Sequence, residues 1–248
     1  TLTHALTHAL THTLQAVLGV AHGNVIGLDF GSDSMKVALV QPGKPLEIVT
    51  NFESSRKTPG CITFYRGERS FGAGAYALMS RKPDLSFAKM WRMIGRNPSD
   101  PMITELREQY FPYKVYANET MHGATCIQQE ETFYTPEELL AMMMQHAKDM
   151  TKNYGGKSIS DCVITVPSHF TQHQRRALIN SAEVADLRVL SLVEENTAAA
   201  LHYGIDRVFE KPHTILYYNM GSASTQVSIV TYDSYKTKEA GKNKTIGQ

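Results

Sequence analysis

Cysteine is scarce in this sequence, with three residues among 248. Cys61, Cys126 and Cys162 lie far apart and form no CxxC pair, which argues against a zinc site or a disulfide framework. An excess of one charge is also lacking, because 25 Lys and Arg residues balance 24 Asp and Glu residues to a net charge of +1. We therefore expect no nucleic-acid partner.

Long apolar runs are absent as well. No stretch approaches the roughly 18 consecutive apolar residues that span a bilayer, so we expect no membrane span. Hydrophobic residues make up 42% of the chain, which is enough for one large or two small domains. Residues 1–22 repeat Thr-His-Ala-Leu without a basic start or an unbroken apolar core. We interpret residues 1–23 as a leader or disordered tail.

One stretch organises the chain, residues 25–40, which read VIGLDFGSDSMKVALV. Two short apolar runs flank a turn, a pattern that predicts a tight β-hairpin. A glycine followed by small hydroxyl residues suits a phosphate, and Asp29 at the strand end is placed to hold a hydrated divalent cation. An ordinary surface hairpin is the alternative. The candidate phosphate-binding residues of this turn are Gly31, Ser32, Asp33 and Ser34.

A second copy of this pattern favours the functional interpretation. Residues 215–230 read ILYYNMGSASTQVSIV and match the first copy without a gap, so that Asp29 aligns with Asn219. Two matched hairpins indicate a duplicated fold whose halves clamp a polyphosphate from opposite sides, as in the actin-like ATPase fold. The candidate residues of the second turn are Gly221, Ser222, Ala223 and Ser224.

Strands and helices alternate between the two hairpins. Capping boxes at Thr135 and Thr171 predict two helices, and the β-branched run 161–166 predicts a strand buried on both faces. A further strand at 188–193, a turn at 194–196 and a short helix at 197–203 follow. This alternation predicts an α/β architecture.

Five motifs in this order resemble the nucleotide-binding domain of the heat-shock 70 chaperone superfamily, most like its large, endoplasmic-reticulum, glucose-regulated (hypoxia up-regulated) branch. The motifs are the two glycine hairpins, Ile94-Gly95-Arg96, Val163–Pro167 with the helix after it, and Glu195–Ala200. The resemblance implies an α/β, actin-like ATPase (ribonuclease H-like) fold. Lobe I would be complete over 24–208, with an inserted subdomain at about 58–131, and lobe II would begin at 209–248 and be truncated.

The resemblance also implies a function. Such a domain would bind ATP or ADP with Mg²⁺ and act in protein folding, in the endoplasmic reticulum lumen or alternatively the cytoplasm. It would serve a conventional heat-shock 70 chaperone as nucleotide exchange factor and hold unfolded clients through regions outside this chain. Two alternatives stay open: a small-molecule kinase on the same fold, and an interaction module that binds no nucleotide.

Roles carried over by motif place residues 32–34 at the β- and γ-phosphates, with 221–224 as the opposing loop. Asp29 would order the magnesium through water, and Asn219 would be a second, weak metal contact. Glu195 would lie near the metal and the attacking water as the catalytic carboxylate. The implied reaction is in-line attack of water on the γ-phosphate, which depends on positioning and charge stabilisation.

Three departures from the family pattern remove charge from this site. Trp91 stands at the position of the family's catalytic lysine when the chain is aligned on Ile94-Gly95-Arg96, and Lys89 lies two residues before it. Asn219 and Gln226 stand where the family has acids. An amide supplies no negative charge and cannot act as a base. We therefore expect nucleotide binding to survive better than hydrolysis.

Overall fold

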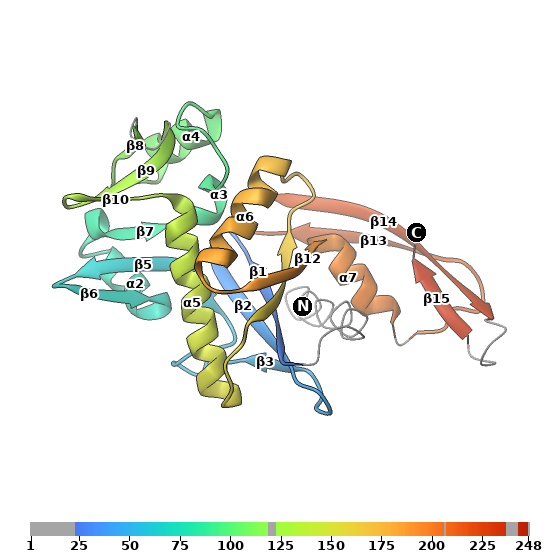
Figure 1. The fold of residues 1–248 in the computed structure, drawn as a ribbon. Helices are drawn as coiled ribbons and strands as arrows, with labels where there is room; N and C mark the ends of the chain where they lie inside the picture. The colour runs from blue at the N-terminus through green and yellow to red at the C-terminus, as the bar shows by residue number, and fades with distance from the viewer. Residues whose placement is uncertain (1–22, 119–122, 206, 237–242, 248) are drawn as a thin grey trace.

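The computed structural model describes residues 23–118, 123–205, 207–236 and 243–247. Residues 1–22 of the expected leader or tail lie outside this part. The centre is a six-stranded sheet in the order β12-β11-β1-β2-β3, with β4 also paired to β2 (Figure 1). Its strands are β1 (Val25–Phe30), β2 (Ser34–Val40), β3 (Glu47–Val49), β4 (Thr58–Pro59), β11 (Asp161–Val166) and β12 (Arg188–Glu194).

Strands β1 and β11 run parallel through the middle of this sheet and are buried along their whole length, as the β-branched run predicts. Side chains alternate between the two faces of a strand. Ile26 and Leu28 join one hydrophobic cluster, and Val25 joins a second cluster on the opposite face. Asp29 shares the parity of Val25, so its carboxylate lies on the second face.

Helices cover both faces of the central sheet. They are α5 (Pro136–Gly155) and α6 (Gln172–Val184) on one face and α7 (Glu195–Gly204) on the other (Figure 1). Both predicted capping boxes are confirmed, with Thr135 and Glu138 at the start of α5 and Thr171 and Gln174 at the start of α6. The predicted turn at 194–196 is wrong, because α7 already begins at Glu195.

Helix α5 presents one buried stripe to the sheet. Leu139, Met143, Ala147 and Met150 lie in the first hydrophobic cluster, as their spacing predicts. Tyr154 continues the same spacing but is 42% exposed. It lies in the last turn of the helix, before the left-handed cap residue Gly156. None of the helices in the described part of the chain is long and apolar enough to cross a membrane.

Short elements occupy the chain between β3 and α5. They form two three-stranded sheets, β6-β5-β7 and β10-β9-β8, beside the central sheet (Figure 1). Their bounds are β5 (Cys61–Tyr65), β6 (Glu68–Phe71), α2 (Gly72–Met79), a 3₁₀ turn (Pro83–Leu85), β7 (Ser86–Ala88), α3 (Met90–Met93), α4 (Pro101–Gln109), β8 (Val115–Asn118), β9 (Ala124–Gln129) and β10 (Thr132–Tyr134).

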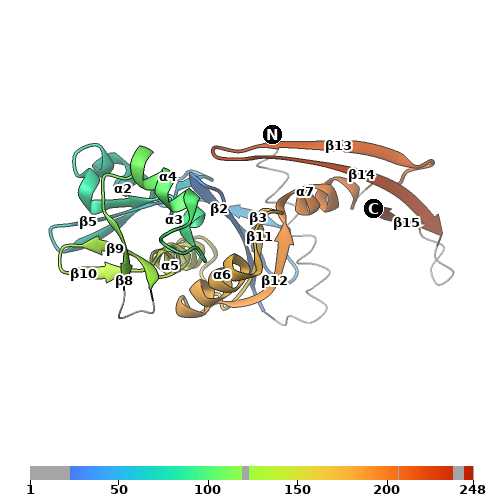
Figure 2. The same cartoon turned by 90° about the horizontal axis from the view of Figure 1, so that it is seen from above.

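The second predicted hairpin is confirmed as β13 (His213–Met220) and β14 (Thr225–Lys236), paired antiparallel. With β15 (Asn243–Gly247) it makes a separate sheet, a long ribbon seen at the top of Figure 2. Helix α7 packs against this ribbon through Tyr232, whose hydroxyl donates to the Ala200 carbonyl at 2.7 Å. Helix α7 therefore joins the ribbon to the central sheet.

Candidate functional site

A cleft of about 500 Å³ lies between the turns of the two hairpins. It brings together the residues that the sequence singles out. Its lining includes Asp29, Gly31, Ser32, Asp33, Ser34, Trp91, Glu195, Asn219, Gly221, Ser222, Ala223 and Ser224. Gln226 lies outside the lining but hydrogen-bonds Glu195.

The two turns have the same local geometry. The Gly31 N–H donates to the Ser34 carbonyl at 2.9 Å, and the Gly221 N–H donates to the Ser224 carbonyl at 2.8 Å. A Cβ atom added to either glycine would lie 3.1 or 3.3 Å from that same carbonyl oxygen. Both positions therefore favour glycine for the same steric reason, and the duplication seen in the sequence extends to the backbone.

Asp29 is buried at the end of β1 and is held from two neighbouring strands. The Lys36 Nζ atom of β2 lies 3.2 Å from Oδ2, and the Thr165 hydroxyl of β11 donates to Oδ1 at 3.0 Å. Sequence reasoning missed both partners. Lys36 had a detectable signal, because it faces Asp29 directly across the hairpin in an otherwise apolar strand.

Glu195, at the first position of α7, accepts hydrogen bonds from both of the amides that stand at the family's acid positions. The Asn219 Nδ2 and Gln226 Nε2 atoms donate to its Oε2 atom at 3.1 and 2.7 Å. Burial, and then the negative charge of Asp29, raise the pKa of Glu195 to about 7, while the two amides and Lys36 act in the opposite direction. The carboxyl group is thus poised to exchange a proton near neutral pH.

Gln226 links the ribbon to the central sheet. Its Oε1 atom accepts from both the backbone N–H and the hydroxyl of Ser168, at 3.1 Å each, while its amide nitrogen donates to Glu195. Ser168 lies in the loop that follows β11. Sequence reasoning missed Ser168, since only the fold brings the two loops together.

Trp91 places an aromatic ring, and no charge, at the lysine position. It is 4% exposed, and its ring centroid lies 5.6 Å from that of Phe30 and 5.0 Å from that of Phe170. Lys89 has a left-handed backbone (φ 61°), and its Nζ atom lies 3.7 Å from an Asp33 carboxylate oxygen. This lysine is absent from the lining of the cleft.

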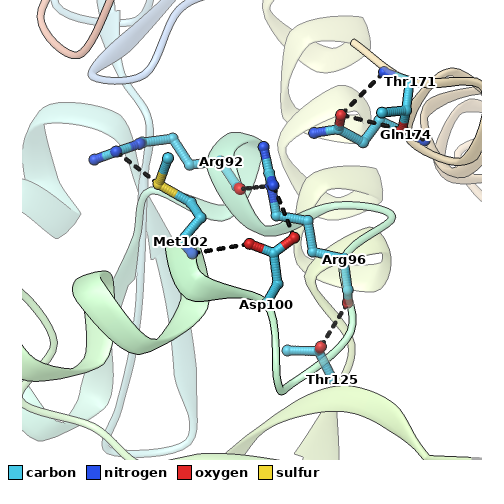
Figure 3. Close-up of polar contacts among 7 residues, drawn as sticks. All are labelled: Arg92, Arg96, Asp100, Met102, Thr125, Thr171 and Gln174. Carbon is cyan, nitrogen blue, oxygen red and sulfur yellow. Dashed lines mark hydrogen bonds and ion pairs between the residues drawn. The ribbon is translucent and has the colours of Figure 1, made fainter. Parts of the chain in front are cut away.

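The loop after α3 contributes Arg96 to the lining of the cleft, and Figure 3 shows the polar contacts of this residue. The Arg96 guanidinium donates to Asp100 at 2.9 Å and to the Arg92 carbonyl at 3.0 Å. Gly95 has φ +63°, and a Cβ atom there would lie 2.6 Å from the Gln174 Cα atom. Position 95 of the Ile94-Gly95-Arg96 motif therefore requires glycine, because α6 approaches the backbone closely there.

The donor set of the cleft fits a phosphate ligand with a hydrated cation. Gln174 borders the cleft, is 2% exposed, and its Nε2 donor has no hydrogen-bond acceptor among the described residues. No group of three or more His, Cys, Asp or Glu side chains in the described ranges could hold a metal directly. A Mg²⁺ ion would therefore be held by Asp29 through water and by phosphate oxygens, which is the usual manner of Mg²⁺ binding.

The comparisons with known proteins agree with these features. The family model described as "Hsp70 protein" matches residues 25–245. "Hypoxia up-regulated protein 1" of Danio rerio is 39% identical over 221 residues, covering 88% of this chain and 22% of the relative. The Xenopus tropicalis protein of that name is 38% identical over 220 residues, covering 88% and 34%.

The Homo sapiens protein of the same name is 37% identical over 223 residues, covering 88% of this chain and 22% of the relative. The chain thus spans between about a fifth and a third of the length of the curated relatives it matches. The resemblance to the large hypoxia up-regulated branch is confirmed by these relatives, and the mixed α/β architecture is consistent with an actin-like ATPase fold. The chain belongs to the Hsp70 family.

Proposed function

We propose that this chain is a chaperone-type nucleotide-binding domain that takes ATP or ADP with Mg²⁺ into the cleft between its two glycine turns. The observation that carries this proposal is the pair of turns with matched geometry on opposite sides of one cleft, beside the buried Asp29 carboxylate. Membership of the Hsp70 family supports the same conclusion.

In this proposal the hydroxyls and backbone of residues 32–34 bind the β- and γ-phosphates, and residues 221–224 bind them from the other side. Asp29 and, more weakly, Asn219 orient the waters around Mg²⁺. The bound ion supplies positive charge that offsets the phosphate oxygens. Glu195 orients the attacking water, and its carboxylate is the group that would accept the proton of that water.

We propose further that hydrolysis is weak or absent. Asn219 and Gln226 replace two carboxylates around Glu195, and the lysine position carries the buried Trp91 ring. A domain that binds nucleotide without consuming it suits a nucleotide exchange factor and holdase. The conventional heat-shock 70 partner, the unfolded clients and the endoplasmic reticulum lumen are parts of the same proposal, based on the resemblance to the hypoxia up-regulated relatives.

Single-turnover hydrolysis of labelled ATP by the protein at its full natural length, with bound nucleotide quantified in the same samples, tests both statements. Binding with little product supports them. Turnover equal to that of a conventional Hsp70 would refute weak hydrolysis, and the absence of binding would refute the nucleotide site.

A pair of variants that each introduce one negative charge adds a control to this experiment. Ser222→Glu places a carboxylate in the second turn, where it would repel phosphate, and should abolish binding. Ser158→Glu makes the same change at an exposed loop position outside the cleft and should leave binding intact. Equal binding by both variants would count against phosphate contact at the second turn.

A further inference from the structure

Lys36 is a cation inside the cleft that none of the motifs explains. It lies on β2, a strand whose other residues are all buried, and its side chain is only 14% exposed. The Nζ atom lies 3.2 Å from Asp29, and 4.0 Å from where a Cβ atom of Gly31 would be, so the ammonium group stands beside the first phosphate turn. A lysine ammonium group that is enclosed to this extent needs hydrogen-bond acceptors other than solvent for its three N–H donors.

Other basic residues also border the cleft, among them Arg56 and Lys57, which are exposed where Lys36 is enclosed. Trp91 supplies no charge, and Lys89 lies beside Asp33 outside the cleft lining. Arg92 and Arg96 border the cleft, but the first donates to the Met102 sulfur and the second to Asp100. Lys36 is therefore the enclosed cation that stands next to both Asp29 and the first turn.

We propose that the Lys36 ammonium is the phosphate-binding cation of this site, bridging Asp29 and the β- or γ-phosphate of the bound nucleotide in place of a lysine at position 91. This inference rests on the nucleotide site proposed above. One N–H of the ammonium keeps Asp29 oriented, and the others turn to phosphate oxygens, which form stronger hydrogen bonds with a charged donor than with a neutral one.

The test measures the affinities of ATP, ADP and AMP for the full-length protein and for Lys36→Met, which keeps the length of the side chain and removes its charge. We expect ATP and ADP to bind about 10- to 100-fold more weakly to the variant, as the loss of a hydrogen bond between charged groups implies. AMP, which lacks the β-phosphate, should bind equally to both proteins. Lys36→Arg should restore much of the lost affinity, because it keeps the charge.

A purely structural role for Lys36 would give a different pattern. Removing the partner of the buried Asp29 would weaken ATP, ADP and AMP alike, and that result would overturn the inference. Lys89→Met tests whether Lys89 is the phosphate-binding cation instead of Lys36. If ATP and ADP bound more weakly to this variant alone, the inference would also be overturned. Lys152→Met, at an exposed position on α5, is the matched control and should change nothing.

A second measurement does not depend on the folding of a variant. The rate of acetylation of Lys36 in the wild-type protein should fall when ADP is present and stay constant with AMP. Equal rates with ADP and AMP, in a protein shown to bind both, would refute the role of Lys36 while leaving the nucleotide site standing. Failure of the wild-type protein to bind any of the three nucleotides would instead refute the proposed function, and this inference with it.

Discussion

At the scale of single residues, the fold acts most directly on Glu195. Its carboxylate is partly buried within reach of the negative charge of Asp29, and two amides donate to the same oxygen atom. Carboxylates at positions 219 and 226 would add two negative charges to this group, which only a bound cation could offset. We therefore expect the two amides to favour folding of the site without nucleotide and to weaken its proposed binding of Mg²⁺.

The raised pKa of Glu195 makes stability depend on pH. Because the pKa rises from 4.5 to about 7, the neutral form favours the fold, and its contribution is complete below about pH 4.5 and lost as pH rises through about 7. Glu195→Gln cannot ionise, so above pH 7 it should be more stable than wild type by about 1–3 kcal/mol. Denaturant unfolding at pH 5 and pH 8 without nucleotide measures the difference, and a pH-independent difference would contradict the assignment.

Trp91 makes restoration of the family lysine unfavourable. Trp91→Lys would bury an ammonium between Phe30 and Phe170 and remove the aromatic packing. We expect the free energy of unfolding to fall by about 3–5 kcal/mol, whereas Trp91→Phe should lose much less. Thermal denaturation of both variants gives the comparison, and equal melting temperatures would show that the ring is not needed for packing.

Negative charge at positions 219 and 226 should be restored at a smaller cost in stability than the lysine at position 91. Asn219→Asp with Gln226→Asp should increase Mg²⁺-dependent ATP turnover by about 10-fold or more, since each carboxylate adds negative charge beside the proposed Mg²⁺ position. The same variant should unfold more easily in EDTA than in Mg²⁺. Without the cation, the carboxylates at positions 195, 219 and 226 would repel one another. Turnover that stays at the wild-type level would place the defect elsewhere, and Asn153→Asp, at an exposed position on α5, controls for added charge.

At the scale of elements, α7 and the β13–β14 ribbon depend on one close approach. A Cβ atom at Gly204 would lie 2.5 Å from the Tyr232 ring, so this position requires glycine for packing. Gly204 is the last residue of α7, and the next residue keeps right-handed helical angles. The absence of a side chain here lets the helix touch the ribbon.

A pair of glycine variants tests this packing. Gly204→Ala should lower the free energy of unfolding by about 1–3 kcal/mol, because the tyrosine must move. Gly74→Ala, in α2, meets nothing within 4 Å and should raise it by about 0.5–1 kcal/mol through helix propensity. Urea titrations of both variants provide the measurement. Equal effects would mean that Tyr232 does not restrict the helix.

At the scale of the whole molecule, one face of the β13–β14 ribbon, the long hairpin of Figure 2, carries exposed apolar side chains. Leu216 and Ile229 lie opposite each other across the two strands and are 58% and 66% exposed. Their neighbours on this face are Tyr218, Met220 and Val227, each at least half exposed. A contiguous patch of this kind promotes association in water.

The 248-residue chain should therefore self-associate as its concentration rises. Leu216→Thr with Ile229→Thr should reduce this association while leaving the melting temperature nearly unchanged, because both side chains are already exposed and threonine suits a strand. Sedimentation velocity over a concentration series measures the effect. Val184→Thr, an exposed residue of α6, is the control, and an equal reduction there would contradict a role for the ribbon.

Much of this architecture follows from local patterns in the sequence. The capping boxes at Thr135 and Thr171 predicted the starts of α5 and α6, and the turn residues predicted both hairpins. These signals act through neighbours a few residues away, so a single sequence contains them. The start of α7 was misplaced because its N-cap residue, Glu194, makes no side-chain capping hydrogen bond, and the side chain of Glu195 is bound by the ribbon.

The sequence by itself determined the two matched turns, the central strands and the loss of charge at positions 91, 219 and 226. Only the tertiary structure decided what replaces that charge. It paired Lys36 with Asp29, enclosed Trp91 between two aromatic rings, and joined Gln226 to Ser168 and Glu195. Hairpin turns depend on local backbone angles, whereas these contacts depend on which distant segments the packed core brings within hydrogen-bond distance.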